Sequence, residues 1–211
     1  MQPKKATAWK RNRQFGDIMG GRMRTKLDGG IFKRFHSLTA PTPGTELPIF
    51  IQDNPSKAFY YPLTIEEIKA ILPTLPAAHT QPLTHIWLSK VGKLSYLSGE
   101  IPRGHFISGS KVYLIKLYAI SKDNRLYFGR KRPDTKTLSF YAEHSTDLHK
   151  DGNGYYLQFT DVTIKMSYRK ILLHEIGHCV DLVYKGRWSP ANRQKTEDFA
   201  DAYASTWEKT Q

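Results

Sequence analysis

The chain has one cysteine, Cys179, among its 211 residues. No intramolecular disulfide can form, so side-chain packing, with or without a metal, must hold the fold together. A chain of this kind suits a reducing compartment. The sequence also lacks any apolar run close to the roughly 18 residues that a membrane span requires, and we expect no span.

The N-terminus lacks the apolar stretch of a secretory signal. Its first 17 residues, MQPKKATAWKRNRQFGD, carry charges where such a signal would be hydrophobic. We therefore expect no conventional export signal and take the cytoplasm as the default location. The same residues are rich in arginine and poor in acids, and this composition leaves an organelle transit peptide open as an alternative.

Acidic residues are scarce, with 19 Asp and Glu against 32 Lys and Arg and a net charge of +13. Residues 1–36 hold ten Lys or Arg against Asp17 and Asp28 and alone contribute +8. A basic excess raises the affinity for nucleic acid and other polyanions. Glycine pairs and prolines also punctuate residues 1–45, which we predict to be an arm, either binding polyanions through residues 1–36 or acting as a solubilising tail. Residues 46–211 are the predicted globular domain.

The first part of this domain shows the pattern of a sheet with one short helix. Thr64 and Glu67 form a capping box ahead of a helix over residues 65–72, which Pro73 ends. Residues rich in β-branched and aromatic side chains predict strands at 85–88, 111–120, 125–128 and 155–159, with 137–141 as an additional strand and 47–51 as either a short strand or an anchoring extended piece. The turn sequence at 121–124 predicts a hairpin, and the one at 151–154 predicts a turn into the strand at 155–159. We expect a mixed or antiparallel sheet of four or five strands.

After Asp161 the hydrophobic period becomes helical. Ser167 is the predicted N-cap of a helix that ends at Gly186. Ser189-Pro190 then predicts the start of a second helix, with an apolar face that includes Phe199 and Tyr203. The predicted fold class is α+β, with the sheet packed on the first of two C-terminal helices.

The first of these helices carries the sequence His174-Glu175-Ile176-Gly177-His178, which has the pattern H-E-x-x-H. Residues four apart lie one above the other on a helix, so both imidazoles can reach one metal ion. Glu175 lies about one step round the helix, where it can act as general base toward water. The pattern arises by chance in roughly one of a hundred shuffles of this composition.

A catalytic zinc site usually takes three protein ligands, so a third is needed. Sequence distance alone allows Asp181, Glu197, Asp198 or Asp201. Glu197 and Asp201 share one face of the second helix and Asp198 points away, so we expect Glu197 to be the ligand and Asp201 to orient a ligand histidine. For Asp181 an exposed position without function is the alternative.

H-E-x-x-H followed about twenty residues later by Glu197-x-x-x-Asp201 resembles the gluzincin type of zincin metallopeptidases. The stretch Glu197-x-x-Ala200-Asp201-x-Tyr203-Ala204 is similar to a motif of the small intracellular ImmA and IrrE-like zinc peptidases. The resemblance covers about residues 168–207. It implies a zincin-like fold, a zinc ion, a peptide or protein substrate and Glu175 as catalytic base, with an edge strand offered to an extended substrate.

Three functions follow as hypotheses: a zinc metallopeptidase, a catalytically silent zinc domain that binds a partner, and a basic nucleic-acid-binding module. An intact Glu175 favours the first over the second, because a structural site has no use for that base. Cys179 is expected to be a buried small hydrophobe. The sequence leaves the oligomeric state open and does not choose the group that stabilises an oxyanion; the candidates are Tyr184, Arg187, Tyr203, His144 and His149.

Overall fold

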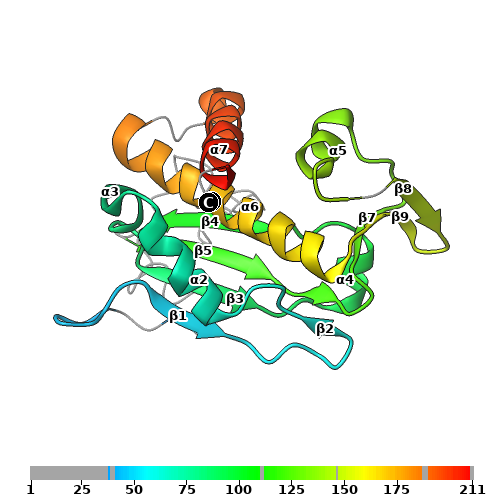
Figure 1. The fold of residues 1–211 in the computed structure, drawn as a ribbon, viewed down its shortest axis with the longest axis horizontal. Coiled ribbons are helices and arrows are strands. Elements are labelled where there is room, and N and C mark those ends of the chain that lie inside the picture. Colours follow the sequence, from blue (N-terminus) through cyan, green and yellow to red (C-terminus); the bar gives the residue numbers. More distant parts are fainter. Residues whose placement is uncertain (1–37, 39–40, 110–111, 146, 187–189, 210–211) are drawn as a thin grey trace, which may run out of the picture.

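The computed structural model describes residues 38, 41–109, 112–145, 147–186 and 190–209. The predicted polyanion-binding segment, residues 1–36, lies outside this range, as do Arg187 and Ser189. Helices and strands of the described part form an α+β arrangement with a mixed sheet, as predicted (Figure 1). No helix in these ranges combines the length and hydrophobicity needed to cross a membrane.

The main sheet has four strands in the order β1-β3-β5-β4. Their bounds are β1 (Ile49–Gln52), β3 (His85–Ser89), β5 (Val112–Tyr118) and β4 (Gly104–Gly109). β1, β3 and β5 run parallel, whereas β4 pairs antiparallel with β5. β4 is therefore an edge strand of this sheet, and it lies on the side that faces the C-terminal helices (Figure 1).

Alternation along the strands gives the sheet two apolar faces. The main core contains the side chains of Ile86 and Leu88 from β3 and of Ile115 and Leu117 from β5. Trp87 and Leu114, at intervening positions, join a smaller cluster instead. The main cluster also contains the buried residues of the long C-terminal helix, so this face of the sheet supports that helix.

Short helices complete the N-terminal half. They are α2 (Ile65–Ile71), the 3₁₀ turn η3 (Leu72–Thr74), α3 (Ala77–Thr80) and α4 (Lys93–Leu97). The predicted capping box at the start of α2 is present, because Thr64 accepts from Glu67 N and Glu67 accepts from Thr64 N. Ile68 and Ile71 pack this helix against the main core.

The predicted strand at 137–141 is wrong, because these residues belong to helix α5 (Thr135–Tyr141). Asp134 caps this helix, its carboxylate accepting a hydrogen bond of 2.7 Å from Thr137 N. The cap satisfies one of the free N–H groups of the first turn and outweighs the strand propensity of the β-branched and aromatic side chains. In chain order, α5 lies between two strands that belong to a second sheet, described next.

This second sheet has the order β7-β9-β8. Its strands are β7 (Arg125–Gly129), β8 (Leu148–Asp151) and β9 (Gly154–Gln158). The turn predicted at 151–154 is present and joins β9 to β8, a strand that the sequence patterns do not predict. The hairpin predicted across 121–124 is wrong: the run 111–120 breaks at Ala119, so that β5 stays in the main sheet and β6 (Ile120–Ser121) pairs with β2 (Phe59–Tyr60).

Two C-terminal helices pack together across the sheet (Figure 1). They are α6 (Asp161–Val180), extended by the π-helical turn η4 (Asp181–Lys185), and α7 (Arg193–Glu208), preceded by the 3₁₀ turn η5 (Pro190–Asn192). The predicted cap at Ser167 is wrong. Thr160 caps α6 through a reciprocal pair with Thr163, and Ser167 is buried inside the helix.

α6 and α7 are in close contact at Gly177. A Cβ atom at this position would lie 2.9 Å from Ala200 Cα and 3.1 Å from Tyr203 Cβ. Real side chains essentially never approach backbone atoms so closely, so only glycine allows this contact without a shift of one helix. Gly177, which precedes the second motif histidine, therefore allows the close approach of the two helices.

Gly177→Ala should lower the free energy of unfolding. Overpacking costs about 1–3 kcal/mol, which exceeds the roughly 0.5–1 kcal/mol that alanine contributes through helix propensity. Urea unfolding measures the difference. Gly152→Ala is the matched control, because a Cβ on that exposed turn meets no atom within 4 Å. Equal or higher stability of Gly177→Ala relative to the unsubstituted protein would show that the helices are not held at contact distance.

Candidate metal centre

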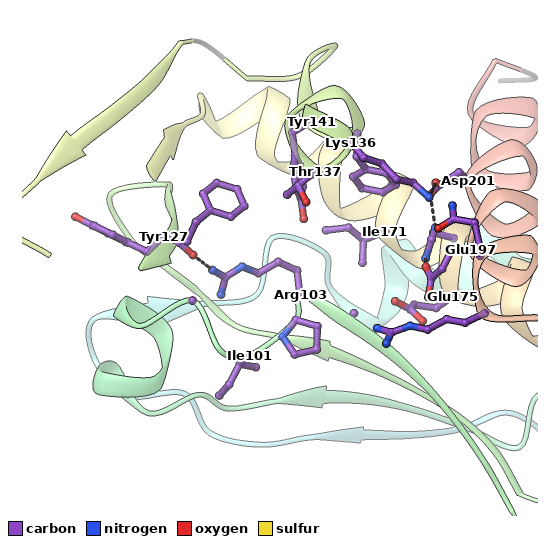
Figure 2. A pocket seen from close by; sticks show the side chains of 18 of the residues that line it. Ile101, Arg103, Tyr127, Lys136, Thr137, Tyr141, Ile171, Glu175, Glu197 and Asp201 are labelled. Atoms are coloured by element: carbon purple, nitrogen blue, oxygen red, sulfur yellow. Dashed lines mark hydrogen bonds and ion pairs between the residues drawn. The ribbon is translucent and has the colours of Figure 1, made fainter. Parts of the chain in front are cut away.

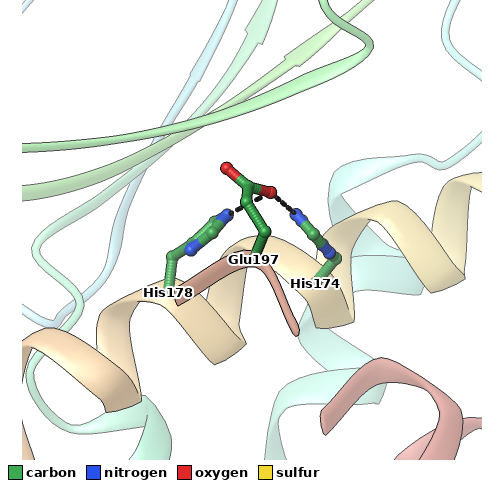
Figure 3. A group of neighbouring side chains, drawn as sticks. All are labelled: His174, His178 and Glu197. Atoms are coloured by element: carbon green, nitrogen blue, oxygen red, sulfur yellow. Dashed lines mark ion pairs between the residues drawn. The ribbon is translucent and has the colours of Figure 1, made fainter. Parts of the chain in front are cut away.

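Three side chains from two helices converge on one point. His174 and His178 lie one turn apart on α6, with ring centroids 4.6 Å apart. Their Nε2 atoms lie 3.5 and 3.6 Å from the same oxygen, Oε2 of Glu197 on α7. Figure 3 shows both imidazoles turned toward this carboxylate. The arrangement matches the ligand set that the motif predicts.

The donor set suits a zinc ion. One ligand atom from each of His174, His178 and Glu197 lies within 4.8 Å of the other two. Two imidazole nitrogens and one carboxylate oxygen are a typical ligand set of catalytic zinc sites, which keep a further position open. Both histidines are largely buried, which limits the access of solvent to the site.

The charges of the three groups are strongly coupled. Hydrogen bonds from His174 and His178 hold the pKa of Glu197 far below its usual value. Burial alone would lower the pKa of His174, but hydrogen bonds to Asp201 and Glu197 and the charge of Glu175 outweigh it and raise the pKa to about 10. At neutral pH the metal-free site therefore holds an imidazolium beside carboxylates, in the place where a metal cation would bind.

Asp201 lies where the sequence places it, beside a ligand histidine. Its Oδ1 is 3.0 Å from Nδ1 of His174, the nitrogen that does not face Glu197. A carboxylate at this nitrogen fixes the orientation of the ring and increases its basicity. Asp201 Oδ2 lies 3.3 Å from Nζ of Lys136 on α5, so a second element is tied to the same carboxylate.

The rival carboxylates lie elsewhere. Asp198 is exposed and bonds to Lys136 Nζ at 3.2 Å and to Gln194 Nε2 at 2.7 Å. Asp181 is fully buried at the start of η4, contrary to the exposed position considered for it, and it does not line the cleft described below. Cys179 is buried, and burial raises the pKa of its thiol to about 12, as expected of a small hydrophobe.

A cleft of about 830 Å³ opens beside the three ligands. Glu175 lines it together with His174, Glu197 and Asp201, and its side chain is only 7% exposed (Figure 2). Gly104 of the edge strand β4 lies against this carboxylate, since a Cβ there would be 2.6 Å from Glu175 Oε1. The backbone of β4 and the predicted base therefore meet at the cleft.

Helix α5 forms a wall of the cleft that sequence reasoning missed. Phe140 stacks edge-on against His174 with ring centroids 5.6 Å apart, and Lys136 reaches Asp201. Thr137 and Tyr141 also line the cleft. The one sequence signal for this helix is Asp134, three residues before Thr137, which is the spacing of an N-cap and its bonded amide.

The oxyanion-stabilising candidates named from the sequence do not line the cleft, insofar as they are described. Tyr203 OH lies 3.0 Å from His79 Nδ1, and Tyr184 OH donates to Ala78 O. His144 pairs with Glu208, and His149 stacks on Tyr156. The donors that do line it are Arg103, Tyr127, Lys136, Thr137, Tyr141, Arg193 and Gln194.

A second group, Glu143, His144 and Glu208, also has ligand atoms within 4.8 Å of one another. Lys170, which is buried, occupies this group: its Nζ lies 2.8 Å from Glu143 Oε2 and 3.6 Å from Glu208 Oε2. An ammonium already supplies the positive charge that a metal would bring. The group is therefore an ion-pair cluster that ties the end of α5 to α6 and α7.

Comparisons with known proteins give no relative: no family model, curated protein or solved structure matches the chain. The site is therefore defined by its own geometry.

Glu197→Ala should remove most of the zinc affinity, because it deletes one of three ligands. His174→Ala and His178→Ala should do the same, and Asp201→Ala should weaken binding by about 10- to 100-fold through loss of ring orientation. Chelator competition measures each affinity. Asp198→Ala is the matched control and should bind zinc normally. If Asp198→Ala or Asp201→Ala strips the metal and Glu197→Ala keeps it, the ligand set is wrong.

Zinc binding at pH 7 should release about one proton, because the ion displaces the proton held by His174 with its raised pKa. Calorimetric titration in buffers of different ionisation enthalpy measures the release. The part of this release that comes from His174 should fall toward zero as the pH rises through about 10, where His174 is already neutral, whereas ionisation of a zinc-bound water adds protons at higher pH. Asp201→Asn should lower the pKa of His174 and therefore reduce the release at pH 8. Equal release by Asp201→Asn and the unsubstituted protein at pH 8 would contradict this picture.

Proposed function

We propose that the protein is a zinc-dependent metallopeptidase with a zincin-like domain of the gluzincin type. The convergence of His174, His178 and Glu197 on one point, with Glu175 beside them in a cleft, is the observation that carries the proposal. The resemblance of residues 168–207 to small intracellular zinc peptidases supports it. A reducing, cytoplasmic setting accords with the buried thiol of Cys179.

In the proposed reaction, His174, His178 and Glu197 hold the zinc ion and Asp201 keeps His174 oriented. When bound, zinc would polarise a substrate carbonyl and lower the pKa of water. Glu175 takes the proton of the attacking water and then delivers it to the leaving amine. Its burial against β4 holds the carboxylate in place for both transfers.

The position of the edge strand β4 favours a peptide as the substrate. β4 is unpaired on one side within the described sheet, and its first residue, Gly104, lies against Glu175 and lines the cleft. An extended peptide can add to such an edge through main-chain hydrogen bonds, which brings a peptide bond beside the base. A cleft of about 830 Å³ accommodates several residues of such a substrate.

The alternative is a catalytically silent zinc domain that binds a partner. Glu175 argues against it, because a purely structural site needs no general base, and this buried residue lines the cleft beside the proposed ligands. A basic module that binds nucleic acid through residues 1–36 is a separate function, compatible with either.

Glu175→Gln should keep zinc but lose peptide hydrolysis by about 10²- to 10⁴-fold, the usual contribution of a general base. The amide preserves the shape and burial of the side chain but does not accept the proton. Cleavage of a denatured protein substrate, followed by mass spectrometry, measures activity, and elemental analysis measures zinc. Zinc loss comparable to that of His174→Ala would assign Glu175 as a ligand. Undiminished hydrolysis would exclude it as the base.

A further inference from the structure

Arg103 lies at the end of the cleft away from the metal ligands. It precedes β4, is only 6% exposed and lines the cleft. Figure 2 shows its side chain extending toward Tyr127, with Glu175 and Glu197 on the opposite side. Nη2 donates to the carbonyl oxygen of Tyr127, and the guanidinium carbon lies 4.6 Å from the ring centre of Tyr96.

These contacts leave most of the guanidinium unsatisfied. Arginine has five side-chain N–H donors, and among the described residues the Arg103 guanidinium donates one hydrogen bond, to Tyr127 O. Its Nη1 is buried and has no hydrogen-bond partner. Among the residues that the structure describes, no Asp or Glu forms an ion pair with Arg103. A buried cation without an anion is costly, and it is kept where an anionic ligand completes it.

The charge of the cleft points the same way. Three carboxylates line it, from Glu175, Glu197 and Asp201, and three cationic side chains, from Arg103, Lys136 and Arg193. A divalent metal ion would make this lining net positive. Glu197 and Asp201 are engaged by His174, and Lys136 is neutralised by Asp198 and Asp201. Arg103 is therefore the buried cation of the cleft that has no anionic partner.

We propose that Arg103 forms a subsite for a carboxylate of the peptide substrate, so that the enzyme selects acidic segments or free C-termini. This inference rests on the proposed peptidase function. The planar guanidinium binds a carboxylate through paired hydrogen bonds, which a neutral amide cannot match. Ile101, Tyr127 and Tyr141 line the same cleft and supply apolar surface around Arg103.

The test compares matched peptides. Fluorescein-labelled octapeptide mixtures carry Glu or Gln fixed at each position in turn, and a second set carries a free or an amidated C-terminus. Affinities for the zinc-loaded Glu175→Gln variant should favour the carboxylate peptides by about 10- to 100-fold at one position. The first set reports an acidic side chain and the second a C-terminal carboxylate. Equal affinities in both sets would overturn the proposal.

Arg103→Gln, made in the Glu175→Gln background, should bring the ratio of carboxylate-peptide affinity to amide-peptide affinity close to one. Arg103→Lys should keep part of this ratio. The ratio is taken within each variant, so a partly unfolded sample does not change it. Arg193→Gln removes the same charge from an exposed position of the cleft and is the matched control. Equal loss of the ratio in Arg193→Gln, or an unchanged ratio in Arg103→Gln, would overturn the proposal.

Hydrolysis by the protein with Glu175 intact separates the two proposals. Cleavage of peptides without preference for carboxylates would refute the Arg103 subsite and leave the peptidase standing. Selective binding of carboxylate peptides without cleavage of any of them would refute the peptidase and retain the subsite.

Discussion

The contact between α6 and α7 at Gly177 is the constraint on which the metal centre depends. Two ligands belong to α6 and the third to α7, so the helices must approach until Glu197 reaches both imidazoles. Glycine permits this approach, because Ala200 and Tyr203 occupy the space that a side chain would need. On another side of α6, Gly104 lets β4 approach Glu175 in the same manner. Close backbone packing on two sides therefore positions the ligands and the base together.

Charge links this packing to the cleft. Asp201 contacts His174 with one oxygen and Lys136 with the other, so the orientation of a ligand ring and the position of α5 depend on one carboxylate. The Lys170 cluster fixes the far end of α5 through Glu143 next to its last turn. Phe140, between these two anchors, packs against His174. The wall of the cleft and the metal centre are therefore mechanically coupled.

Local patterns predicted much of the site, and long-range contacts explain what they missed. The relation of His174 to His178, and of Glu197 to Asp201, follows from helical spacing, which sequence reveals directly. Residues 137–141 form a helix and not the predicted strand, because Asp134 caps their first turn, and the hairpin predicted after residue 120 does not form, because β5 pairs with β3 and β4 instead. Arg103 and Lys136 belong to no sequence motif, so only the folded structure shows that they line the cleft. The zincin-like fold itself stays a prediction.

The candidate metal ligands and the proposed base lie on different elements from much of the cleft wall. α6 and α7 carry the former, whereas α5 lies in a connection between strands β7 and β8. Such connections tolerate changes in length and composition far better than packed helices do. Under the proposed function, evolution can therefore diversify the choice of substrate by altering this connection, without rebuilding the candidate metal centre. Lys136 limits that freedom, because a changed connection must still supply a group that contacts Asp201.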